Sequence, residues 1–257
     1  MTEKALNNRK NGMVVLLLLV LVYVASVVLF IFGVSYDILP LTLISCVWFV
    51  FGWIFFLGLK VLKPQEALVL TLFGKYVGTL KNSGFYFVNP FCTAVNPAAG
   101  TKLNQSGDVK VLGAKQPSGG VDVSIDIPTK KISLKIMTLN NNRQKINDCL
   151  GNPVEIGIAV MWRVVDTAKA VFNVDNYKEY LSLQCDSALR NIVRIYPYDI
   201  APNVDTTGDG IADEGSLRGS SEVVAARIKD EIQDKVSEAG IEILEARITY
   251  LAYAPEI

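Results

Sequence analysis

Two long apolar runs near the start of the chain constrain its fold more than any other feature. The first, Met13–Val34, holds 22 residues without a formal charge. As a helix it would be about 33 Å long, which is enough to cross a hydrocarbon core about 30 Å thick. Turn-forming residues follow in Ser35–Pro40, and a second apolar run occupies Leu41–Leu59. The two runs predict a transmembrane helical hairpin over residues 13–60.

A cleaved signal peptide is the alternative interpretation of the first run. Its apolar region would be about 7–15 residues long and would end at a small-residue cleavage site. The first run is longer than this and a second run follows at once, so we favour two membrane spans. Neither run contains an acidic or basic residue, which argues against an ion or proton pathway through the hairpin.

Basic residues flank the predicted hairpin on both sides and are absent from its turn. Lys4, Arg9 and Lys10 precede the first run, and Lys60 and Lys63 follow the second. Loops rich in Lys and Arg stay on the cytoplasmic side of a membrane. We therefore expect a cytoplasmic tail over residues 1–12 and a cytoplasmic domain over residues 61–257, in an integral membrane protein with two spans.

The composition excludes several classes of function. Lys and Arg together number 25, as do Asp and Glu, so the basic surplus typical of nucleic-acid binders is missing and no nucleic-acid partner is expected. The chain has no histidine, which excludes Ser-His-Asp catalysis and histidine-ligated zinc. Its four cysteines form no C-x-x-C motif. We expect a protein that is not an enzyme and has no resident cofactor. The cysteines are Cys46, Cys92, Cys149 and Cys185.

The part after the hairpin mixes strand and helix patterns. Strands are predicted at residues 67–73, 131–138, 154–165 and 241–250, a helical turn at 166–171, and helices at 175–195 and 222–239 with Asp175 and Ser221 as caps. Residues 92–128 form a long polar insertion rich in glycine. An aromatic segment within Gly84–Phe91 fits either a core strand or a wedge in the bilayer interface. Its aromatic residues are Phe85, Tyr86, Phe87 and Phe91.

One apolar stripe on the last predicted helix repeats every four residues. It consists of Val224, Ile228, Ile232 and Val236. Such a stripe is typical of a helix packed on its own sheet. The alternative is an oligomer interface, in which the same stripe contacts a neighbouring subunit.

An acidic loop over residues 201–216 resembles a calcium-binding loop. Oxygen-bearing residues alternate in it, and Gly210 supplies a sharp turn. However, Ser216 stands at the twelfth position, where a bidentate glutamate is usual, so an acidic surface loop without metal is favoured. The candidate ligands are Asp205, Thr207, Asp209 and Asp213.

Several separated blocks, in order, resemble the SPFH or band-7 superfamily, which includes the stomatins, prohibitins and flotillins. The blocks are Lys63–Thr79, Gly84–Phe91, Gly151–Ile156, Trp162–Ala170 and Glu238–Glu256. The resemblance implies an α+β fold, in which the two-helix transmembrane hairpin precedes a mixed-sheet SPFH domain with packed helices. In members of this superfamily the segment that corresponds to Gly84–Phe91 often lies near the membrane. The resemblance therefore strengthens the interpretation of this segment as a wedge in the bilayer interface.

The resemblance carries functional expectations as well. Proteins of this kind assemble with themselves or with a paralogue into rings or cages on a membrane. They organise lipid microdomains and hold membrane proteins, including proteases, and the resemblance transfers no catalytic residue. Two departures are that the 92–128 insertion is long and that the chain stops where members continue into a long helix, as expected of a fragment or a shortened member. Alternatives are a calcium-responsive membrane adaptor, an accessory subunit of a membrane protease, and a membrane enzyme that uses the carboxylates of 205–214.

Overall fold

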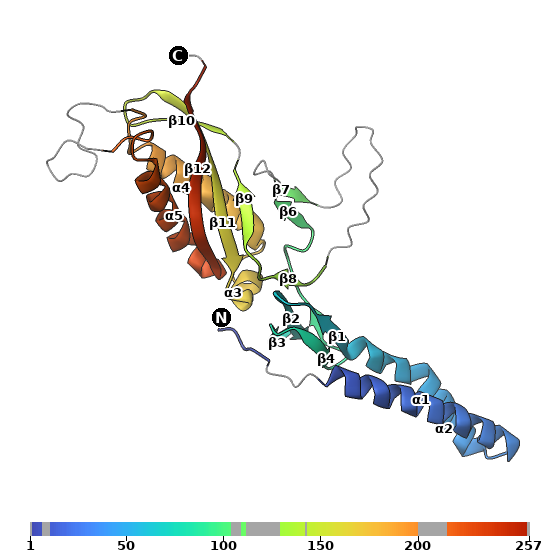
Figure 1. Cartoon of the computed structure of the whole chain (residues 1–257). Helices are drawn as coiled ribbons and strands as arrows, with labels where there is room; N and C mark the ends of the chain where they lie inside the picture. The colour runs from blue at the N-terminus through green and yellow to red at the C-terminus, as the bar shows by residue number, and fades with distance from the viewer. Residues whose placement is uncertain are drawn as a thin grey trace, which may run out of the picture. The chain divides into compact units, whose positions relative to one another are not determined.

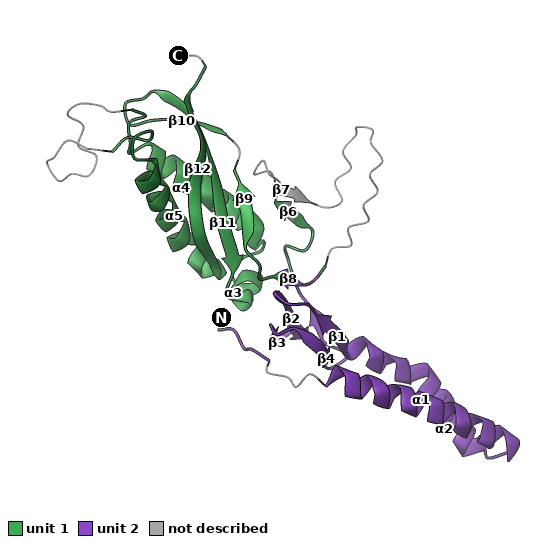
Figure 2. Ribbon diagram, viewed as in Figure 1, with its two compact units in different colours: residues 1–2, 96–129, 133–257 green, residues 3–95, 130–132 purple. Residues whose placement is uncertain are grey.

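The computed structural model describes residues 2–6, 11–103, 109–111, 129–141, 143–199 and 215–255 (Figure 1). The chain divides into two compact units, coloured separately in Figure 2. The hairpin unit comprises residues 3–95 and 130–132. The helix–sheet unit comprises residues 1–2, 96–129 and 133–257.

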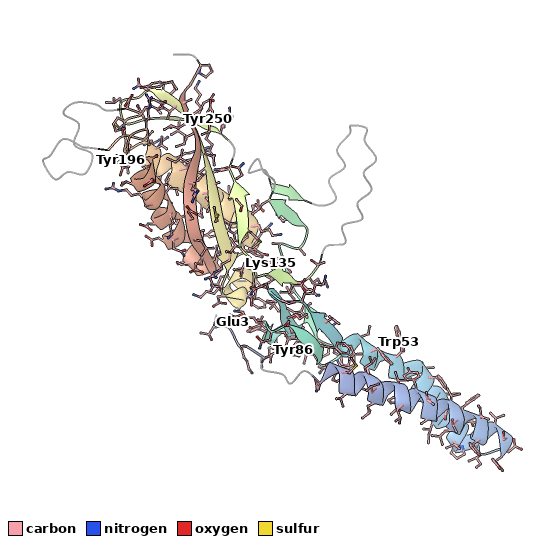
Figure 3. All side chains as sticks on the ribbon, viewed as in Figure 1. Glu3, Trp53, Tyr86, Lys135, Tyr196 and Tyr250 are labelled. Carbon is pink, nitrogen blue, oxygen red and sulfur yellow. The ribbon has the colours of Figure 1, made fainter. Side chains whose placement is uncertain are left out.

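The hairpin unit begins with two apolar helices that pack side by side (Figure 1). Helix α1 spans Gly12–Ser35 and helix α2 spans Leu39–Phe51, which continues as the 3-10 helix η1 over Gly52–Gly58. Both α1 and the joined segment Leu39–Gly58 are long and apolar enough to cross a membrane. Most of their large side chains are exposed; Trp53, for example, is 59% exposed (Figure 3). Such a surface is stable in lipid and costly in water.

Small residues at seven-residue spacing bring the two helices together. The buried residues of α1 are Gly12, Leu19, Ser26 and Gly33, and in the second helix Ser45 and Gly52 are buried at the same spacing. A Cβ placed on Gly33 would lie 2.7 Å from Cγ2 of Thr42, so glycine is needed for this approach. Small or apolar residues that recur every seven positions are typical of two helices packed against each other.

A small antiparallel sheet system follows the hairpin directly. Strand β1 (Leu59–Leu62) pairs with β4 (Gly84–Phe87). Strand β2 (Glu66–Leu72) pairs with β3 (Lys75–Leu80), with β5 (Thr93–Ala94), and with β8 (Ile132–Ser133). Their inward side chains form one apolar core. Its buried members are Leu62, Leu68, Leu70, Leu80, Tyr86, Val88 and Cys92.

The helix–sheet unit is built around one long strand. The central strand β11 (Pro153–Val164) pairs on one side with β12 (Ile241–Tyr253) and on the other with β9 (Met137–Asn140) and β10 (Gln144–Asn147). All these pairings are antiparallel. Figure 1 shows α4 (Tyr177–Val193) and α5 (Ser221–Val236) side by side against this sheet. The remaining elements are β6 (Thr101–Leu103), β7 (Val109–Val111), α3 (Thr167–Phe172) and η2 (Ser237–Ala239).

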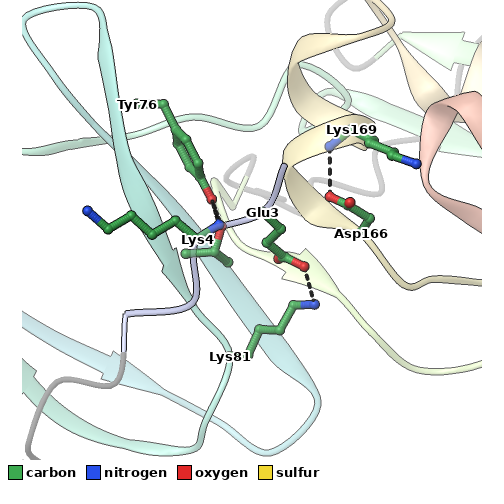
Figure 4. A network of polar contacts seen from close by, with 7 residues as sticks. Glu3, Lys4, Tyr76, Lys81, Asp166 and Lys169 are labelled. Carbon is green, nitrogen blue, oxygen red and sulfur yellow. Dashed lines mark hydrogen bonds and ion pairs between the residues drawn. The ribbon is translucent and has the colours of Figure 1, made fainter. Parts of the chain in front are cut away.

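Local capping explains where these helices begin and end. The Asn176 side chain accepts hydrogen bonds from the backbone N–H groups of Lys178 and Glu179 and so caps α4. Oδ1 of Asp166 caps α3 in the same way, at 2.9 Å from the Lys169 nitrogen (Figure 4). Gly240 closes the last helix with φ of +65°, a left-handed conformation that favours glycine.

The predicted fold class is confirmed, with several local corrections. Asn176, not Asp175, caps α4, and the helix predicted from Glu222 begins at Ser221 with no side-chain cap. The strand predicted over residues 131–138 is two short strands, β8 and β9, because the chain turns between them. Strands β1, β3 and β10 were not predicted. Within the insertion predicted over residues 92–128, the described strand β7 pairs with β6.

Candidate functional site

The two apolar helices are joined to the β-sheet system at strand β4 and the residues after it. A Cβ on Gly12, the first residue of α1, would lie 2.8 Å from the backbone of Phe85. Gly58, the last residue of η1, lies against Val88 so closely that a Cβ would clash with its carbonyl oxygen. The Val88 N–H also donates a hydrogen bond to the Gly58 carbonyl at 2.9 Å. The aromatic segment is therefore held between the first residue of α1 and the last residue of η1.

The four predicted interface aromatics have different environments. Tyr86 is 2% exposed and belongs to the core, where its hydroxyl donates a hydrogen bond to the Asn82 carbonyl at 3.0 Å. Phe85 and Phe87 are half-buried, and Phe91 is 60% exposed. Tyr86 is therefore a core residue. A position in the bilayer interface stays a prediction for Phe91, whose side chain is mostly exposed.

A second exposed aromatic residue, which no sequence motif marked, stands beside Phe91. Phe73 is 88% exposed and stacks on Phe91, with ring centroids 6.5 Å apart and planes inclined by 24°. It occupies the β2–β3 turn with φ of +47°, a conformation that is rare for a bulky residue. Neither exposure nor turn geometry favours phenylalanine here, so burial in the core does not explain this residue. The sequence feature that could have identified Phe73 is an aromatic residue at a turn position that normally carries a polar residue.

The chain segment that carries this aromatic pair is rich in lysine. Between Gly58 and Phe91 the chain carries four lysines and one acidic residue, Glu66. Within the described residues Lys60 and Lys75 form no ion pair, whereas Lys81 pairs with Glu3 at 2.6 Å. Cations in the same chain segment as exposed aromatic rings suit the headgroup layer of an anionic membrane.

The chain segment before α1 is tied to the same sheet system as the segment after α2. Ala5 forms a parallel bridge with Thr79, and the N–H of Thr79 donates to the Lys4 carbonyl at 2.9 Å. Figure 4 shows the Glu3–Lys81 ion pair and the hydrogen bond from the Lys4 N–H to the Tyr76 hydroxyl at 3.2 Å. Both ends of the hairpin are therefore bound to one small β-structure.

Two groups in this unit have pKa values shifted by their surroundings. Partial burial alone would raise the pKa of Glu66, but the ammonium group of Lys131 at 2.9 Å and the Lys63 N–H outweigh it and hold that pKa below 4.5. Burial raises the pKa of the Cys92 thiol, and the positive charge of Lys60 opposes this only in part. A thiol held neutral in this way is a packing residue and a poor nucleophile.

The other predicted sites fall elsewhere. Asp205, Thr207, Asp209 and Asp213 lie outside the described residues, as does most of the 92–128 insertion. Among the residues described, no group of three or more acidic, cysteine or histidine side chains is placed to hold a metal ion.

The stripe predicted as an oligomer interface lies inside the subunit. Val224, Ile228, Ile232 and Val236 are all fully buried, because α5 packs against β12 and α4. This corrects the prediction of a subunit contact through these side chains, and leaves the interpretation of a helix lying on its own sheet.

Taken together, a pair of apolar helices, a β-structure fixed at their ends and a separate helix–sheet unit define a membrane-associated α+β protein. A comparison with protein-family models matches residues 60–257 to the SPFH domain / Band 7 family. This match covers most of the chain, and the protein belongs to that family. A search of curated proteins gave no match.

Proposed function

We propose that this protein is a membrane-anchored scaffold that self-associates, alone or with a paralogue, and gathers lipids and other membrane proteins around it. The observation that carries the proposal is the joint between the hairpin and the β-structure. Because Lys4–Leu6 and β1 belong to one β-structure, a membrane-spanning hairpin has both ends on the same side. Each copy then presents its helix–sheet unit from a fixed anchor.

The proposed side is the cytoplasm. Lys4 precedes the first span, Lys60 and Lys63 follow the second, and residues 35–40 between the spans contain no basic residue. Retention of lysine on the cytoplasmic side favours this orientation. The sequence also supplies Arg9 and Lys10 on the same flank.

The aromatic pair Phe73–Phe91 gives the anchor a second contact with the bilayer. Aromatic rings at the interface bury apolar surface while neighbouring lysines meet the headgroups. A hairpin alone can tilt and rotate in the membrane, whereas interfacial residues set tilt and rotation. The pair thus supports a scaffold whose copies stand in one orientation.

The proposed mechanism is positional rather than chemical. Once copies share a membrane and an orientation, each added contact is made at high effective concentration, so weak lateral contacts accumulate into an assembly. An assembly of this kind confines the membrane proteins inside or beside it. Membership of the SPFH domain / Band 7 family supports this class of role, and a membrane protease is one kind of partner that it fits.

Two measurements test the proposal. The first uses Cys149, which is exposed in the helix–sheet unit, after Cys46 in the second span is replaced by alanine. A membrane-impermeant maleimide should label Cys149 only from the cytoplasmic face of sealed vesicles, while the buried Cys92 and Cys185 stay protected. Labelling from the opposite face would contradict the orientation.

The second measurement is the size of the complex in nanodiscs, by mass photometry. Discrete assemblies of many copies are expected. A strictly monomeric protein at all accessible concentrations would exclude the scaffold function.

A further inference from the structure

The short segment before α1, residues 3–6, lies against the small sheet of the hairpin unit as an added strand. Ala5 forms an isolated parallel bridge with Thr79 of β3. The Thr79 N–H donates a hydrogen bond to the Lys4 carbonyl at 2.9 Å, and the Leu6 N–H donates one to the Thr79 carbonyl at 2.9 Å. Strand β3 pairs with β2 on its other side. Residues 3–6, called the N-terminal segment below, therefore cover the outer edge of β3.

Two side chains of the N-terminal segment are held by this edge, and two are not. The Glu3 carboxylate pairs with the Lys81 ammonium group at 2.6 Å and its side chain is only 16% exposed (Figure 4). Leu6 is half-buried and packs against the apolar core of the hairpin unit. Lys4 and Ala5 between them are exposed. The edge thus provides one place for a carboxylate and, three residues later, one for an aliphatic side chain.

The backbone and side chains of β3 are suited to an extended segment at this edge. A Cβ on Gly78 would lie 2.5 Å from Cγ of Leu6 and 2.9 Å from the Lys4 carbonyl oxygen, so glycine leaves the room that the segment needs. The Tyr76 hydroxyl accepts a hydrogen bond from the Lys4 N–H at 3.2 Å. Strand addition of this kind takes its affinity from backbone hydrogen bonds and its specificity from the side chains that face inward.

The N-terminal segment is held by few buried contacts. Its strand pairing is a single isolated bridge, and its ion pair with Lys81 is partly exposed to solvent. Segments with few buried contacts open at a lower free energy than core strands do. The outer edge of β3 can therefore be vacated while the rest of the unit stays folded.

We propose that the outer edge of β3 is a binding site for an extended segment of another membrane protein, which displaces residues 3–6. The inference rests on the proposed function, a scaffold that gathers membrane proteins, and names a surface that holds one of them. The N-terminal segment shows what the site accepts. The expected partner segment carries a carboxylate three residues before an aliphatic side chain, as Glu3 and Leu6 do.

The position of the site in the chain favours a partner in the same bilayer. Leu6 precedes Gly12, the first residue of α1, by six residues, so the two lie at most about 22 Å apart even in a fully extended chain. A segment that directly follows or precedes the membrane span of another protein can reach this edge.

The short pairing of the N-terminal segment favours a different protein over a second copy of this chain. The same segment of a second copy would only replace contacts by identical ones. A longer extended segment can continue the pairing along β3 beyond the isolated bridge at Thr79, and this gain lets it compete with residues 3–6.

The first test measures binding of a fluorescent peptide with the sequence of residues 1–8 to the full-length protein in nanodiscs. A release variant, Glu3→Gln with Leu6→Pro, removes the carboxylate, the aliphatic side chain and the Leu6 N–H donor. We expect the peptide to bind the release variant at least about tenfold more tightly than the wild type, because the wild-type segment occupies the site for most of the time.

The second test exchanges the charges of the ion pair. Lys81→Glu in the release variant should weaken peptide binding by at least about tenfold, since two carboxylates would then face each other. A peptide that carries Glu3→Lys should recover the binding. Lys75→Glu is the matched control, because it makes the same charge change at an exposed side chain on the first residue of the same strand. It should leave peptide binding unchanged.

The third test asks whether a membrane-bound partner reaches the site. A single-span designed helix of leucine and alanine carries residues 1–8 as its cytoplasmic extension and is placed in the same nanodisc as the wild-type protein. It should displace the fluorescent peptide at least about tenfold more effectively than the same helix whose extension carries Glu3→Lys and Leu6→Pro, because a shared bilayer raises its effective concentration. Equal displacement by the two helices would overturn the proposed partner.

The remaining outcomes separate the site from the proposed function. Peptide binding to the release variant but not to the wild type at any accessible concentration would show that residues 3–6 are a permanent strand, and would overturn the site. So would a folded release variant that binds no peptide, although assemblies seen by mass photometry in the same nanodiscs would leave the scaffold intact. Monomeric protein that binds the peptide would overturn the scaffold and not the site.

A single substitution keeps the site testable if the release variant fails to fold, which circular dichroism would reveal. Lys81→Glu in the otherwise wild-type chain repels its own Glu3. The Glu3→Lys peptide should therefore bind this variant at least about tenfold more tightly than the peptide of unchanged sequence does. Equal binding of the two peptides would contradict recognition of a carboxylate by Lys81.

Discussion

Phe73 stacks on Phe91 although 17 residues separate them in the chain, and both rings stay largely in contact with the surroundings of the protein. The hydrogen bond between the hydroxyl groups of Thr71 and Thr93, 3.0 Å apart, holds the two segments together just before and just after the rings. The pairing of β2 with β5 thus places two exposed rings side by side. Such an arrangement is typical of a surface that meets lipid or another protein, not of a core.

A spin label measures whether this pair enters the bilayer. We expect a label at Phe73→Cys, in a chain whose exposed cysteines are replaced by serine, to lie at headgroup depth. It should be less accessible to a water-soluble relaxation agent than a label at Ile136→Cys, an exposed apolar position of the helix–sheet unit. Equal accessibility of the two labels would contradict an interfacial role for Phe73.

The close approach of Gly12 to Phe85 predicts a stability effect at the start of the hairpin. A larger residue forces backbone atoms apart, since a Cβ would lie 2.8 Å from the Phe85 carbonyl carbon. We expect Gly12→Val to lower the stability of the folded protein by about 1–3 kcal/mol, the usual cost of overpacking. Thermal unfolding in detergent measures this. Gly100→Ala is the control, because no atom lies within 4 Å of its added Cβ, and an equal loss there would refute the explanation.

The structure and the sequence pattern assign different residues as the N-terminal cap of α4, and substitutions can test which assignment is right. Asn176→Ala should lower stability by about 1 kcal/mol, because two backbone N–H groups lose their acceptor. Asp175→Ala should have little effect, although the sequence pattern favoured Asp175 as the cap. A larger loss for Asp175→Ala, measured by chemical denaturation, would place the helix start one residue earlier.

Long periodic patterns were predictable from the sequence, and short contacts were not. The hairpin, β11, β12 and both long helices follow from apolar runs or repeats, which persist over ten or more residues. Strands β1, β3 and β10 contain four to six residues and form only because partners distant in the chain pair with them. The exposure of Phe73 and the burial of Tyr86 depend on the same distant pairings. Local pattern alone therefore identified the aromatic segment but not which of its rings face outward.

The residues of the acidic loop over 201–216 predict how the protein responds to calcium. Because Ser216 replaces the bidentate glutamate of a calcium loop, we expect no heat of calcium binding at millimolar concentration. Asp205→Asn combined with Asp209→Asn should leave assembly and membrane localisation unchanged, as should removal of calcium with a chelator. Disassembly on chelation would instead favour the calcium-responsive adaptor.

The ion pair between Glu66 and Lys131 predicts a specific pH dependence. These residues lie far apart in the chain and join β2 to the segment entering β8, with 2.9 Å between the ammonium and carboxylate groups. Since the folded state lowers the pKa of Glu66 below 4.5, the folded protein binds the proton less readily than the unfolded chain. The contribution of the pair to stability is therefore present in full above pH 4.5 and is lost as the pH falls through the lowered pKa.

Glu66→Gln removes this titration while keeping the size of the side chain. At pH 7 the variant should be less stable than the wild type by about 1 kcal/mol or less, the range for partly exposed ion pairs. The difference in unfolding temperature should shrink as the pH is lowered below 4.5. Lys131→Gln should show the same narrowing, because it removes the other partner of the same pair. A difference that stays constant from pH 7 to pH 3 would show that the amide substitution acts through packing and not through the charge of Glu66.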